Sequence, residues 1–533
     1  MLTIENITYN HPDKTRLFHA LSLSISSGQK IGLIGQNGSG KSTLLRLIAG
    51  ELLPNAGRVK RSTSVYYAPQ VFGQYDACSI AEVLGIASKL QALYTILKGE
   101  ATEEQLLILD DDWTLEERSL QALRYWDVAE INLFAPMSTL SGGQKTKVFL
   151  AGIQIHEPDL VLLDEPSNHL DAASRQLLYN FIRDSKQTLL IVSHDRMLLN
   201  LLPTMYELDA SGVTVYGGNY AFYANQKSIA AQALESSIQH REKELRKAKD
   251  KERDTLERQQ RMDARGKKKQ EKAGVARIMM NTMRNNAEQS TSKMRDVHTE
   301  KINGLSQELT ELRNNRSVVE KMKFGFTDML LHHGKILFDL QNVQYRHAET
   351  NLWTEGISLQ IRSGERLTFK GKNGAGKTTL VRLLLKQLEP TSGTISNFAR
   401  RALYIDQDYS LVNDTDIDVY TRAQQANQRG LQEHEVKARL DRFLFDKTSW
   451  NKPCNTLSGG ERMRLALCVL TLSSEAPDVI ILDEPTNNLD IQNIELLSDA
   501  INSYQGTLLV ISHDEHFLND LRIHREINLT LHH

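Results

Sequence analysis

The chain of 533 residues repeats four short elements in the same order, and this duplication constrains its fold more than any other feature. The elements are a glycine-rich loop, a Leu-Ser-Gly-Gly segment, an Asp-Glu-Pro segment and a Ser-His-Asp segment. They stand at 35–42, 140–144, 162–171 and 193–195, and again at 371–378, 457–461, 481–490 and 512–514. In both copies the glutamate of Asp-Glu-Pro lies 29 residues before the histidine. Chance does not explain this agreement, so the sequence indicates a tandem duplication with an insert.

Short apolar runs bounded by polar residues accompany the repeated elements and indicate buried parallel strands. These runs are Lys30–Ile34, Leu160–Leu163, Leu189–Val192, Arg366–Lys370, Val479–Leu482 and Thr507–Ile511. The first glycine-rich loop leads into a predicted helix over Thr43–Ala49. Strands that alternate with helical stretches predict an α/β fold for each copy.

The insert between the copies differs in charge from the rest of the chain. The segment from Lys227 to Lys323 holds 24 Lys and Arg against 15 Asp and Glu, a net of +9, whereas the whole chain has a net charge of −2. Such asymmetry suggests an element that binds a polyanion. A solvated helical spacer is the alternative, and the charge alone does not choose between them.

The insert is predicted to form an antiparallel helical hairpin. It is rich in good helix formers, and no proline stands between Pro203 and Pro390. A heptad seam is formed by Ile302, Leu305, Leu309 and Leu312, and less regularly by Leu234, Ile238 and Leu245. Gly266 and Gly274 offer places to reverse direction, so we expect the tip between about Arg261 and Met283. Legs of about 35 residues would extend it by about 50 Å.

The glycine-rich loops match the pattern of a phosphate-binding P-loop, placed between a strand and a helix. Backbone N–H groups and the helix N-terminus would hold phosphate oxygens. Lys41 and Lys377 would neutralise the β- and γ-phosphates, and Ser42 and Thr378 would bind Mg²⁺. The predicted nucleotide-binding residues of the loops are Gly35, Gln36, Asn37, Gly38, Ser39, Gly40, Lys41, Ser42 and Thr43, and Gly371, Lys372, Asn373, Gly374, Ala375, Gly376, Lys377, Thr378 and Thr379.

The Asp-Glu-Pro segments supply paired carboxylates at the ends of apolar strands. Asp164 and Asp483 are placed to hold Mg²⁺ through water. The glutamates that follow, Glu165 and Glu484, are placed to polarise the attacking water. His194 and His513 end further strands and are predicted to sense the γ-phosphate. An acidic pair that only caps a helix is the structural alternative.

Together, the P-loop, the Leu-Ser-Gly-Gly signature, Asp-Glu-Pro and the strand-end histidine resemble an ATP-binding cassette domain, twice. The resemblance implies Q-loop glutamines at Gln70 and Gln407, which would also serve the metal, and adenine-stacking aromatics at Tyr9 and Tyr345. Cassettes of this family bind two ATP molecules in a head-to-tail sandwich. Ser141, Gly142, Gly143 and Gln144 would then complete the second site, and Ser458, Gly459, Gly460 and Glu461 the first.

Fused cassettes joined by a charged helical linker, with no membrane span, resemble the ABC-F proteins. Asn-His-Leu-Asp and Asn-Asn-Leu-Asp after the two Asp-Glu-Pro segments strengthen the match. The resemblance implies a cytoplasmic ATPase that needs ATP and Mg²⁺ and acts as a monomer on the ribosome. It would touch rRNA through the hairpin, with tRNA as a second candidate contact. Members of the family regulate translation or protect ribosomes from antibiotics. The implied domains are a cassette at 1–224, a linker at 225–325 and a cassette at 336–533.

Two other functions and one structural choice stay open. The chain could be the ATPase subunit of a transporter with a separate permease, or a DNA-repair ATPase with a helical projection.

The scattered cysteines, Cys78, Cys454 and Cys468, fit a reducing compartment. Gln70 and Ser141 are 71 residues apart, against 51 for Gln407 and Ser458. The extra residues predict either an arm-like insertion or a longer helical subdomain.

Overall fold

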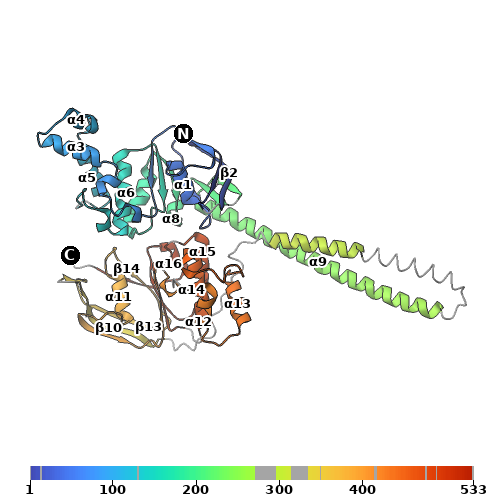
Figure 1. Ribbon diagram of the computed structural model, residues 1–533. Helices are drawn as coiled ribbons and strands as arrows, with labels where there is room; N and C mark the ends of the chain where they lie inside the picture. The colour runs from blue at the N-terminus through green and yellow to red at the C-terminus, as the bar shows by residue number, and fades with distance from the viewer. Residues whose placement is uncertain are drawn as a thin grey trace. The chain divides into compact units, whose positions relative to one another are not determined.

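The computed structural model (Figure 1) divides the chain into two compact units, Met1–Ala221 with Met322–His533, and Phe222–Lys321. The structure describes residues 2–12, 15–128, 131–209, 211–270, 296–313, 334–347, 350–407, 409–412, 417–473, 477–487 and 489–530, with the backbone alone at 259, 263, 264 and 266–270. The first unit contains both cassettes, and the second contains the linker.

The central sheet of the first cassette has six strands in the order β5-β6-β7-β3-β8-β9. These strands are β5 (Val65–Ala68), β6 (Leu160–Asp164), β7 (Thr188–Val192), β3 (Lys30–Ile34), β8 (Thr204–Asp209) and β9 (Gly212–Tyr216). All neighbours pair in parallel except β8 and β9. Strands β6 and β7 are buried along their whole length, which explains their continuous apolar sequence. The predicted strands of this copy are confirmed.

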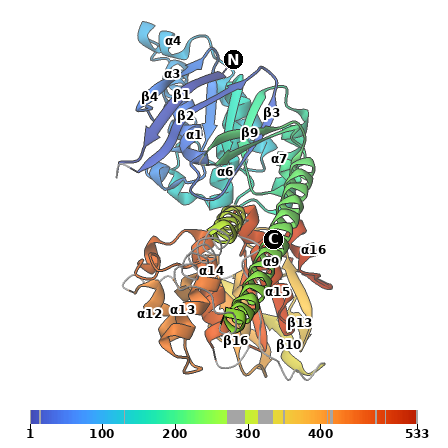
Figure 2. The ribbon, with the colours of Figure 1, turned by 90° about the vertical axis from the view of Figure 1, so that its right-hand side faces the viewer.

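A second, antiparallel sheet of the first cassette has the order β2-β1-β4. It consists of β2 (Arg16–Ile25), β1 (Leu2–Asn10) and β4 (Ala56–Arg61). Helix α1 (Lys41–Ala49) packs its Leu44 and Leu45 into one core with Ile4 of β1 and Leu162 of β6. The helix after the P-loop therefore lies between the two sheets (Figure 2).

The second cassette repeats this arrangement. Its parallel sheet has the order β16-β17-β18-β14-β19, and its antiparallel sheet the order β13-β10-β15. The strands are β16 (Ala402–Ile405), β17 (Val479–Asp483), β18 (Thr507–Ile511), β14 (Arg366–Lys370), β19 (Arg525–Asn528), β13 (Ile357–Arg362), β10 (Ile336–Gln344) and β15 (Ser392–Asn397), with a small pair, β11 (Arg346–His347) and β12 (Thr350–Asn351). Helix α11 (Lys377–Leu384) shares a core with both sheets.

The remaining helices of the first cassette are α2 (Ile80–Val83), α3 (Ala87–Leu97), α4 (Glu103–Leu109), α5 (Leu115–Tyr125), α6 (Gly142–His156), α7 (Ala172–Asp184) and α8 (Arg196–Leu199). Those of the second are α12 (Val419–Gln425), α13 (Glu433–Arg442), α14 (Gly459–Leu472), α15 (Ile491–Asn502) and α16 (Glu515–Asp520). Short 3-10 turns lie at Gly73–Tyr75, Met137–Thr139, Ser410–Val412 and Cys454–Thr456. The extra residues before Ser141 form helices: α3 packs on α4, beside α5 (Figure 1).

The linker begins with one long helix, α9 (Tyr220–Gln270), of 51 residues. At 1.5 Å per residue this helix is about 76 Å long, longer than the leg predicted from the sequence because it runs through Gly266 without a break. A second helix occupies 296–313. The predicted point of reversal beyond Gln270, with Gly274 and Met283, lies outside the described residues.

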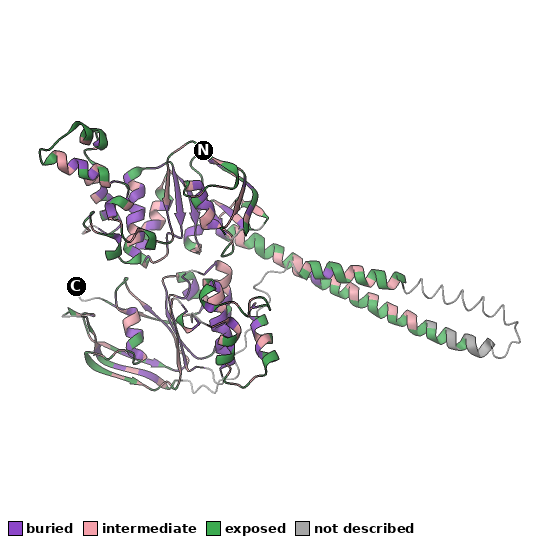
Figure 3. Cartoon of the chain, in the orientation of Figure 1, coloured by how far each residue is buried: buried purple, intermediate pink, exposed green. Residues whose placement is uncertain are grey.

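The two linker helices pack against each other in opposite directions. Arg241 Nε lies 3.2 Å from Glu308 Oε2, and Arg313 donates a hydrogen bond of 2.7 Å to Glu242 Oε1. Leu309 of the predicted seam is buried, as is Ile238 of α9. Most other described side chains of the two linker helices are exposed or half-buried (Figure 3). The antiparallel hairpin and its heptad seam are confirmed over these residues.

Candidate functional site

Both P-loops join the end of a buried strand to the start of a buried helix. Lys41 begins α1, and its Nζ donates hydrogen bonds to the carbonyls of Gly35 (2.8 Å) and Gln36 (3.1 Å). Lys377 begins α11 and makes the same bonds to Gly371 and Lys372. Burial lowers the pKa of both lysines. Each loop therefore curls around its own ammonium group, at a helix N-terminus that favours an anion.

The last glycine of each P-loop, Gly40 or Gly376, packs closely against apolar side chains, a contact that the sequence did not predict. Gly40 has a φ of 94° and caps α1. A Cβ atom there would lie 2.6 Å from Cζ of Phe18. In the second cassette a Cβ atom on Gly376 would lie 2.5 Å from Cδ2 of Leu352 and 3.1 Å from Nε1 of Trp353. The indole N–H of Trp353 donates a hydrogen bond of 3.0 Å to the carbonyl of Ala375. An aromatic ring therefore packs against each P-loop: Phe18 of β2 in the first cassette, and Trp353, which follows β12, in the second.

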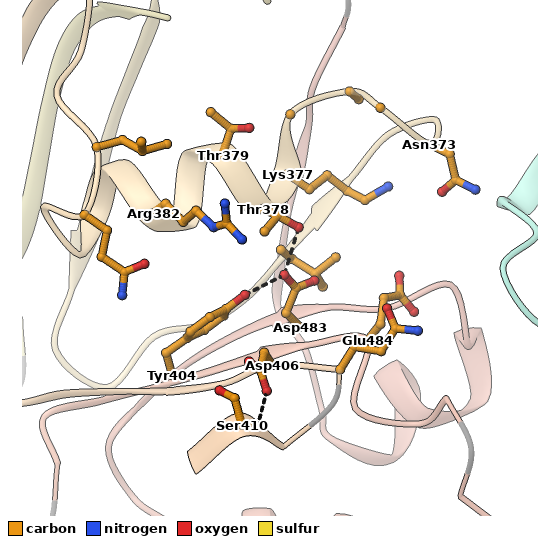
Figure 4. Close-up of a pocket in the computed structure, with 17 residues that line it drawn as sticks. Asn373, Lys377, Thr378, Thr379, Arg382, Tyr404, Asp406, Ser410, Asp483 and Glu484 are labelled. Carbon is orange, nitrogen blue, oxygen red and sulfur yellow. Dashed lines mark hydrogen bonds between the residues drawn. The ribbon is translucent and has the colours of Figure 1, made fainter. Parts of the chain in front are cut away.

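The aspartates of Asp-Glu-Pro lie beside the hydroxyl groups of the P-loops (Figure 4). Thr378 Oγ1 donates a hydrogen bond of 2.8 Å to Asp483 Oδ2, and Tyr404 donates another of 2.9 Å to the same oxygen. In the first cassette the Ser42 side chain bonds to Asp164, and Tyr67 lies 3.4 Å from Asp164 Oδ2. Burial raises the pKa of both aspartates. A tyrosine of the neighbouring strand thus orients each carboxylate.

These groups fit a magnesium ion. Asp164 Oδ1 is buried, and no described residue donates a hydrogen bond to it. The site thus offers an unpaired carboxylate oxygen next to a hydroxyl, which are oxygen ligands of the kind Mg²⁺ prefers.

We expect Tyr404→Phe to weaken Mg²⁺ binding at the second site by about tenfold, because partners that orient a metal ligand contribute about that much. Tyr67→Phe is the matched control, and its longer contact predicts a smaller effect at the first site. The measurement is the Mg²⁺ concentration needed for tight binding of a fluorescent ATP analogue. Equal Mg²⁺ dependence in wild type and Tyr404→Phe would contradict the role assigned to this hydroxyl.

The two glutamates adopt a backbone conformation that is unusual for their type. Glu165 has a φ of 52° and Glu484 a φ of 47°, and such strain costs about 1–3 kcal/mol and is concentrated at functional sites. Burial raises the pKa of Glu165 to about 8 and that of Glu484 to about 7. Desolvated carboxylates of this kind are strong proton acceptors once ionised. A simple helix-capping role does not require this strain.

Each histidine faces the glutamate of its own cassette. His194 donates its backbone N–H to Glu165 Oε2 at 3.1 Å, and its Nε2 lies 3.3 Å from Glu165 Oε1. The corresponding distance from His513 Nε2 to Glu484 Oε1 is 3.6 Å, and Lys377 Nζ lies 3.2 Å from the same nitrogen. Burial lowers the pKa of both imidazoles, that of His513 to about 3. Both rings are therefore neutral at pH 7.

The Leu-Ser-Gly-Gly segments start two buried helices. Ser141 caps α6 and Ser458 caps α14, each in a reciprocal capping box. The partners in these boxes are the side chains of Gln144 and Glu461. The predicted Gln144 and Glu461 thus fix the helix starts, and their direct contact with nucleotide stays a prediction.

The first signature lies against the second P-loop. Asn373 Nδ2 donates a hydrogen bond of 2.8 Å to the carbonyl of His169, and a Cβ atom on Gly143 would lie 3.3 Å from that nitrogen. A cavity of about 250 Å³ is bordered here by residues of both cassettes, among them Ser141, Gly142, Gln407 and Glu484. The structure therefore brings part of the set predicted for the second site together, namely Ser141, Gly142, Gly143, Asn373, Gly374, Gln407, Glu484 and His513.

The aspartate after each Asp-Glu-Pro segment reaches the opposite P-loop, which the sequence alone did not show. Asp490 Oδ2 accepts a hydrogen bond of 3.0 Å from the backbone N–H of Asn37. Asp171 accepts one from the backbone N–H of Asn373. Both aspartates also cap helices, α7 and α15. Their place in the repeated Asn-His-Leu-Asp and Asn-Asn-Leu-Asp segments was the signal that could have found them.

The remaining predicted residues lie at varying distance from this chemistry. Gln407 borders both the cavity of about 250 Å³ and a larger one of about 770 Å³ beside Lys377 and Asp483. Gln70 is half-buried just after β5. Tyr9 and Tyr345 are half-buried and pack against the cores of their cassettes. Adenine stacking by these tyrosines stays a prediction.

Comparison with known proteins agrees with this geometry. The family described as ABC transporter matches residues 18–168 and 354–487, more than half of the chain. The chain is 30% identical to the probable ATP-binding protein YbiT of Escherichia coli O157:H7, over 98% of this chain and 94% of YbiT. It is 29% identical to the energy-dependent translational throttle protein EttA of Haemophilus influenzae, over 96% of this chain and 89% of EttA.

A third relative is ABC transporter F family member 5 of Arabidopsis thaliana, 28% identical over 97% of this chain and 73% of the relative. Among the helices that the structure describes, none combines the length and apolar character needed to cross a bilayer. Two cassettes, each with its P-loop and acidic pair, and relatives that span the whole chain lead to one assignment. The chain belongs to the ABC transporter family, in its F branch of tandem-cassette proteins, and is an ATP hydrolase.

Proposed function

We propose that the chain binds two ATP molecules with Mg²⁺ between its cassettes and uses their hydrolysis to act on the ribosome. The observation that carries the first part is the pairing of each P-loop with residues of the other cassette, through Asp490 on Asn37 and His169 on Asn373. A nucleotide bound on either P-loop would therefore contact both cassettes, so that binding closes the pair and hydrolysis releases it.

The P-loop backbones hold the phosphates in this proposal. Lys41 and Lys377 exchange their present carbonyl partners for the β- and γ-phosphates, because a phosphate binds an ammonium group more strongly than a carbonyl does. The N-termini of α1 and α11 add the partial positive charge of a helix start. Tyr9 and Tyr345 would stack on the adenine rings.

Bound Mg²⁺ would neutralise charge on the phosphates. The residues proposed to hold it are Ser42, Gln70 and Asp164 at the first site, and Thr378, Gln407 and Asp483 at the second. The hydroxyl and carboxylate of each set are already adjacent in the structure.

Hydrolysis needs a group that takes a proton from water, and Glu165 and Glu484 are proposed for this role. Each is desolvated, strained and adjacent to a neutral histidine. His194 and His513 are proposed to hold the γ-phosphate, because a neutral imidazole can donate one N–H while its other nitrogen accepts.

The proposed partner is the ribosome, reached through the basic linker. One relative is named for translational throttling, and the segment from Lys227 to Lys323 carries a net charge of +9. Phosphate contacts of RNA favour such a segment. We further propose a monomer in the cytoplasm, with domains at 1–224, 225–325 and 336–533. Its hairpin touches rRNA, with tRNA as a second candidate contact, in translation regulation or antibiotic protection.

Salt dependence of ribosome binding tests this proposal. The variant Lys267→Gln/Lys268→Gln/Lys269→Gln removes three charges whose side chains lie outside the described part of the structure. Each lost phosphate contact reduces the slope of log affinity against log salt by about 0.7–0.9, so we expect a decrease of about 2–3. Co-sedimentation with purified ribosomes across a salt series measures it, and ATPase activity without ribosomes should be unchanged.

The matched control removes three exposed lysines from the cassettes, Lys98→Gln/Lys186→Gln/Lys447→Gln, and should keep the wild-type slope. Identical slopes for wild type and the linker variant would mean that these lysines meet no RNA phosphate. Sedimentation with membrane vesicles or DNA instead of ribosomes would favour the transporter subunit or the DNA-repair ATPase.

A further inference from the structure

One of the positions at which the two ATP sites differ holds a charged residue in the first cassette and an apolar residue in the second. Arg175 lies four residues after Asp171, and Ile494 lies four residues after Asp490. The two aspartates cap corresponding helices, α7 and α15, so the two side chains occupy equivalent places in their cassettes. Both are buried, but one is a guanidinium and the other a hydrocarbon.

The guanidinium of Arg175 reaches across to the other cassette. Its NH1 group donates a hydrogen bond of 3.2 Å to the main-chain carbonyl of His513. Its Nε donates one of 3.2 Å to the carbonyl of Leu170 in its own cassette, and Asp195 Oδ2 lies 3.9 Å from NH1. Arg175 also borders the cavity of about 250 Å³ that Glu484 and the first signature share.

These contacts fix the main chain next to a proposed site residue. The His513 imidazole lies 3.6 Å from Glu484 and 3.2 Å from Lys377, so a shift of its backbone would move it relative to both. A charged donor contributes more to such a bond than a neutral one. Ile494 has no side-chain donor, so it cannot hold the main chain at His194 in this way.

We propose that Arg175 of the first cassette is a positioning residue for ATP hydrolysis at the second site alone, acting through the main chain of His513. The inference rests on the proposed function, because it requires hydrolysis at both sites. It makes the sites unequal: at the second site the first cassette holds the main chain of His513, whereas at the first site the second cassette reaches Arg196, two residues after His194, through the side chain of Glu495. Docking of the cassettes would therefore affect hydrolysis at the two sites to different extents.

The test isolates the sites before changing the arginine. Glu165→Gln leaves the second site able to hydrolyse ATP, and Glu484→Gln leaves the first. Arg175→Ile, which copies the residue of the other cassette, is added to each, and kcat and KM for ATP are measured. Misplacement of a reacting group by about 1 Å can cost about 100-fold. We expect kcat at the second site to fall at least about tenfold more than at the first, with KM changing far less.

The conservative variant Arg175→Lys keeps a charged donor, a single ammonium group in place of the guanidinium, and should recover part of the second-site kcat. If Arg175→Ile fails to fold, the comparison of kcat at the two sites is made with Arg175→Lys instead. Equal losses at both sites, a change confined to KM, or no recovery with lysine would overturn the inference. Failure of the proposed function looks different: with Arg175 intact, Glu165→Gln and Glu484→Gln combined would then hydrolyse ATP as fast as wild type.

Discussion

Replacing Glu165 and Glu484 together with glutamine should leave ATP bound and stop its hydrolysis. Glutamine has the same shape, so the P-loops and Lys41 and Lys377 keep their contacts, but its amide cannot accept a proton from water. General-base catalysis contributes about 10²–10⁴-fold, so we expect kcat to fall by at least about 100-fold while ATP affinity is kept. The measurement combines steady-state phosphate release with equilibrium binding of ATP.

The matched control carries the same chemical change at two exposed glutamates, Glu104→Gln with Glu389→Gln, and should hydrolyse ATP like wild type. On ribosomes, the double active-site variant should stay bound in the presence of ATP, because the cassette pair cannot release its nucleotides. Wild-type phosphate release by that variant would show that other groups activate the water.

The strands and P-loops could be predicted because their sequence signals are local. An apolar run such as Leu160–Leu163 is buried on both faces only in a covered parallel sheet, and β6 is that strand. The glycine pattern of 35–42 is required by backbone conformation, and the structure has φ of 94° at Gly40. Duplication strengthened each signal, because the same inference was available twice.

The parts that escaped prediction depend on contacts between distant segments. Tyr404 stands in a strand that could equally hold a core tyrosine, and only the pairing of β16 with β17 brings it to Asp483. Arg175 shares the buried face of α7 with Leu178 and Ile182, and only the approach of the second cassette gives it the carbonyl of His513. Trp353 supports a P-loop 22 residues away. Periodicity and spacing carry no information on such contacts.

In the linker, a local sequence signal was misleading. Helix formers predicted its helices correctly, but Gly266 suggested an interruption where α9 continues. One glycine costs a helix only about 1 kcal/mol, and many neighbouring residues with high helix propensity offset this. The heptad leucines were more reliable, because burial of Leu309 against the other leg stabilises both helices together.

The arrangement of the signatures predicts that damage to one cassette appears at the ATP site of the other. Gly143 lies in the first cassette, but an added Cβ atom would lie 2.7 Å from the His169 carbonyl and 3.3 Å from the Asn373 amide nitrogen. Backbone cannot give way cheaply at such a distance, and overpacking costs about 1–3 kcal/mol. The valine would therefore disturb the hydrogen bond from Asn373 to the His169 carbonyl, which joins the two cassettes at the second site.

We therefore expect Gly143→Val, alone or with Ser141→Ala, to weaken ATP binding at the Lys377 site by about 10–100-fold, and to spare the Lys41 site. Gly460→Val is the reciprocal control and should weaken the Lys41 site instead, because head-to-tail pairing assigns the second signature to the first P-loop. Photo-crosslinking with an azido-ATP, followed by identification of the labelled P-loop peptide, measures the two sites separately. Loss confined to the Lys41 site in Gly143→Val would contradict the head-to-tail pairing, since each signature would then serve its own cassette.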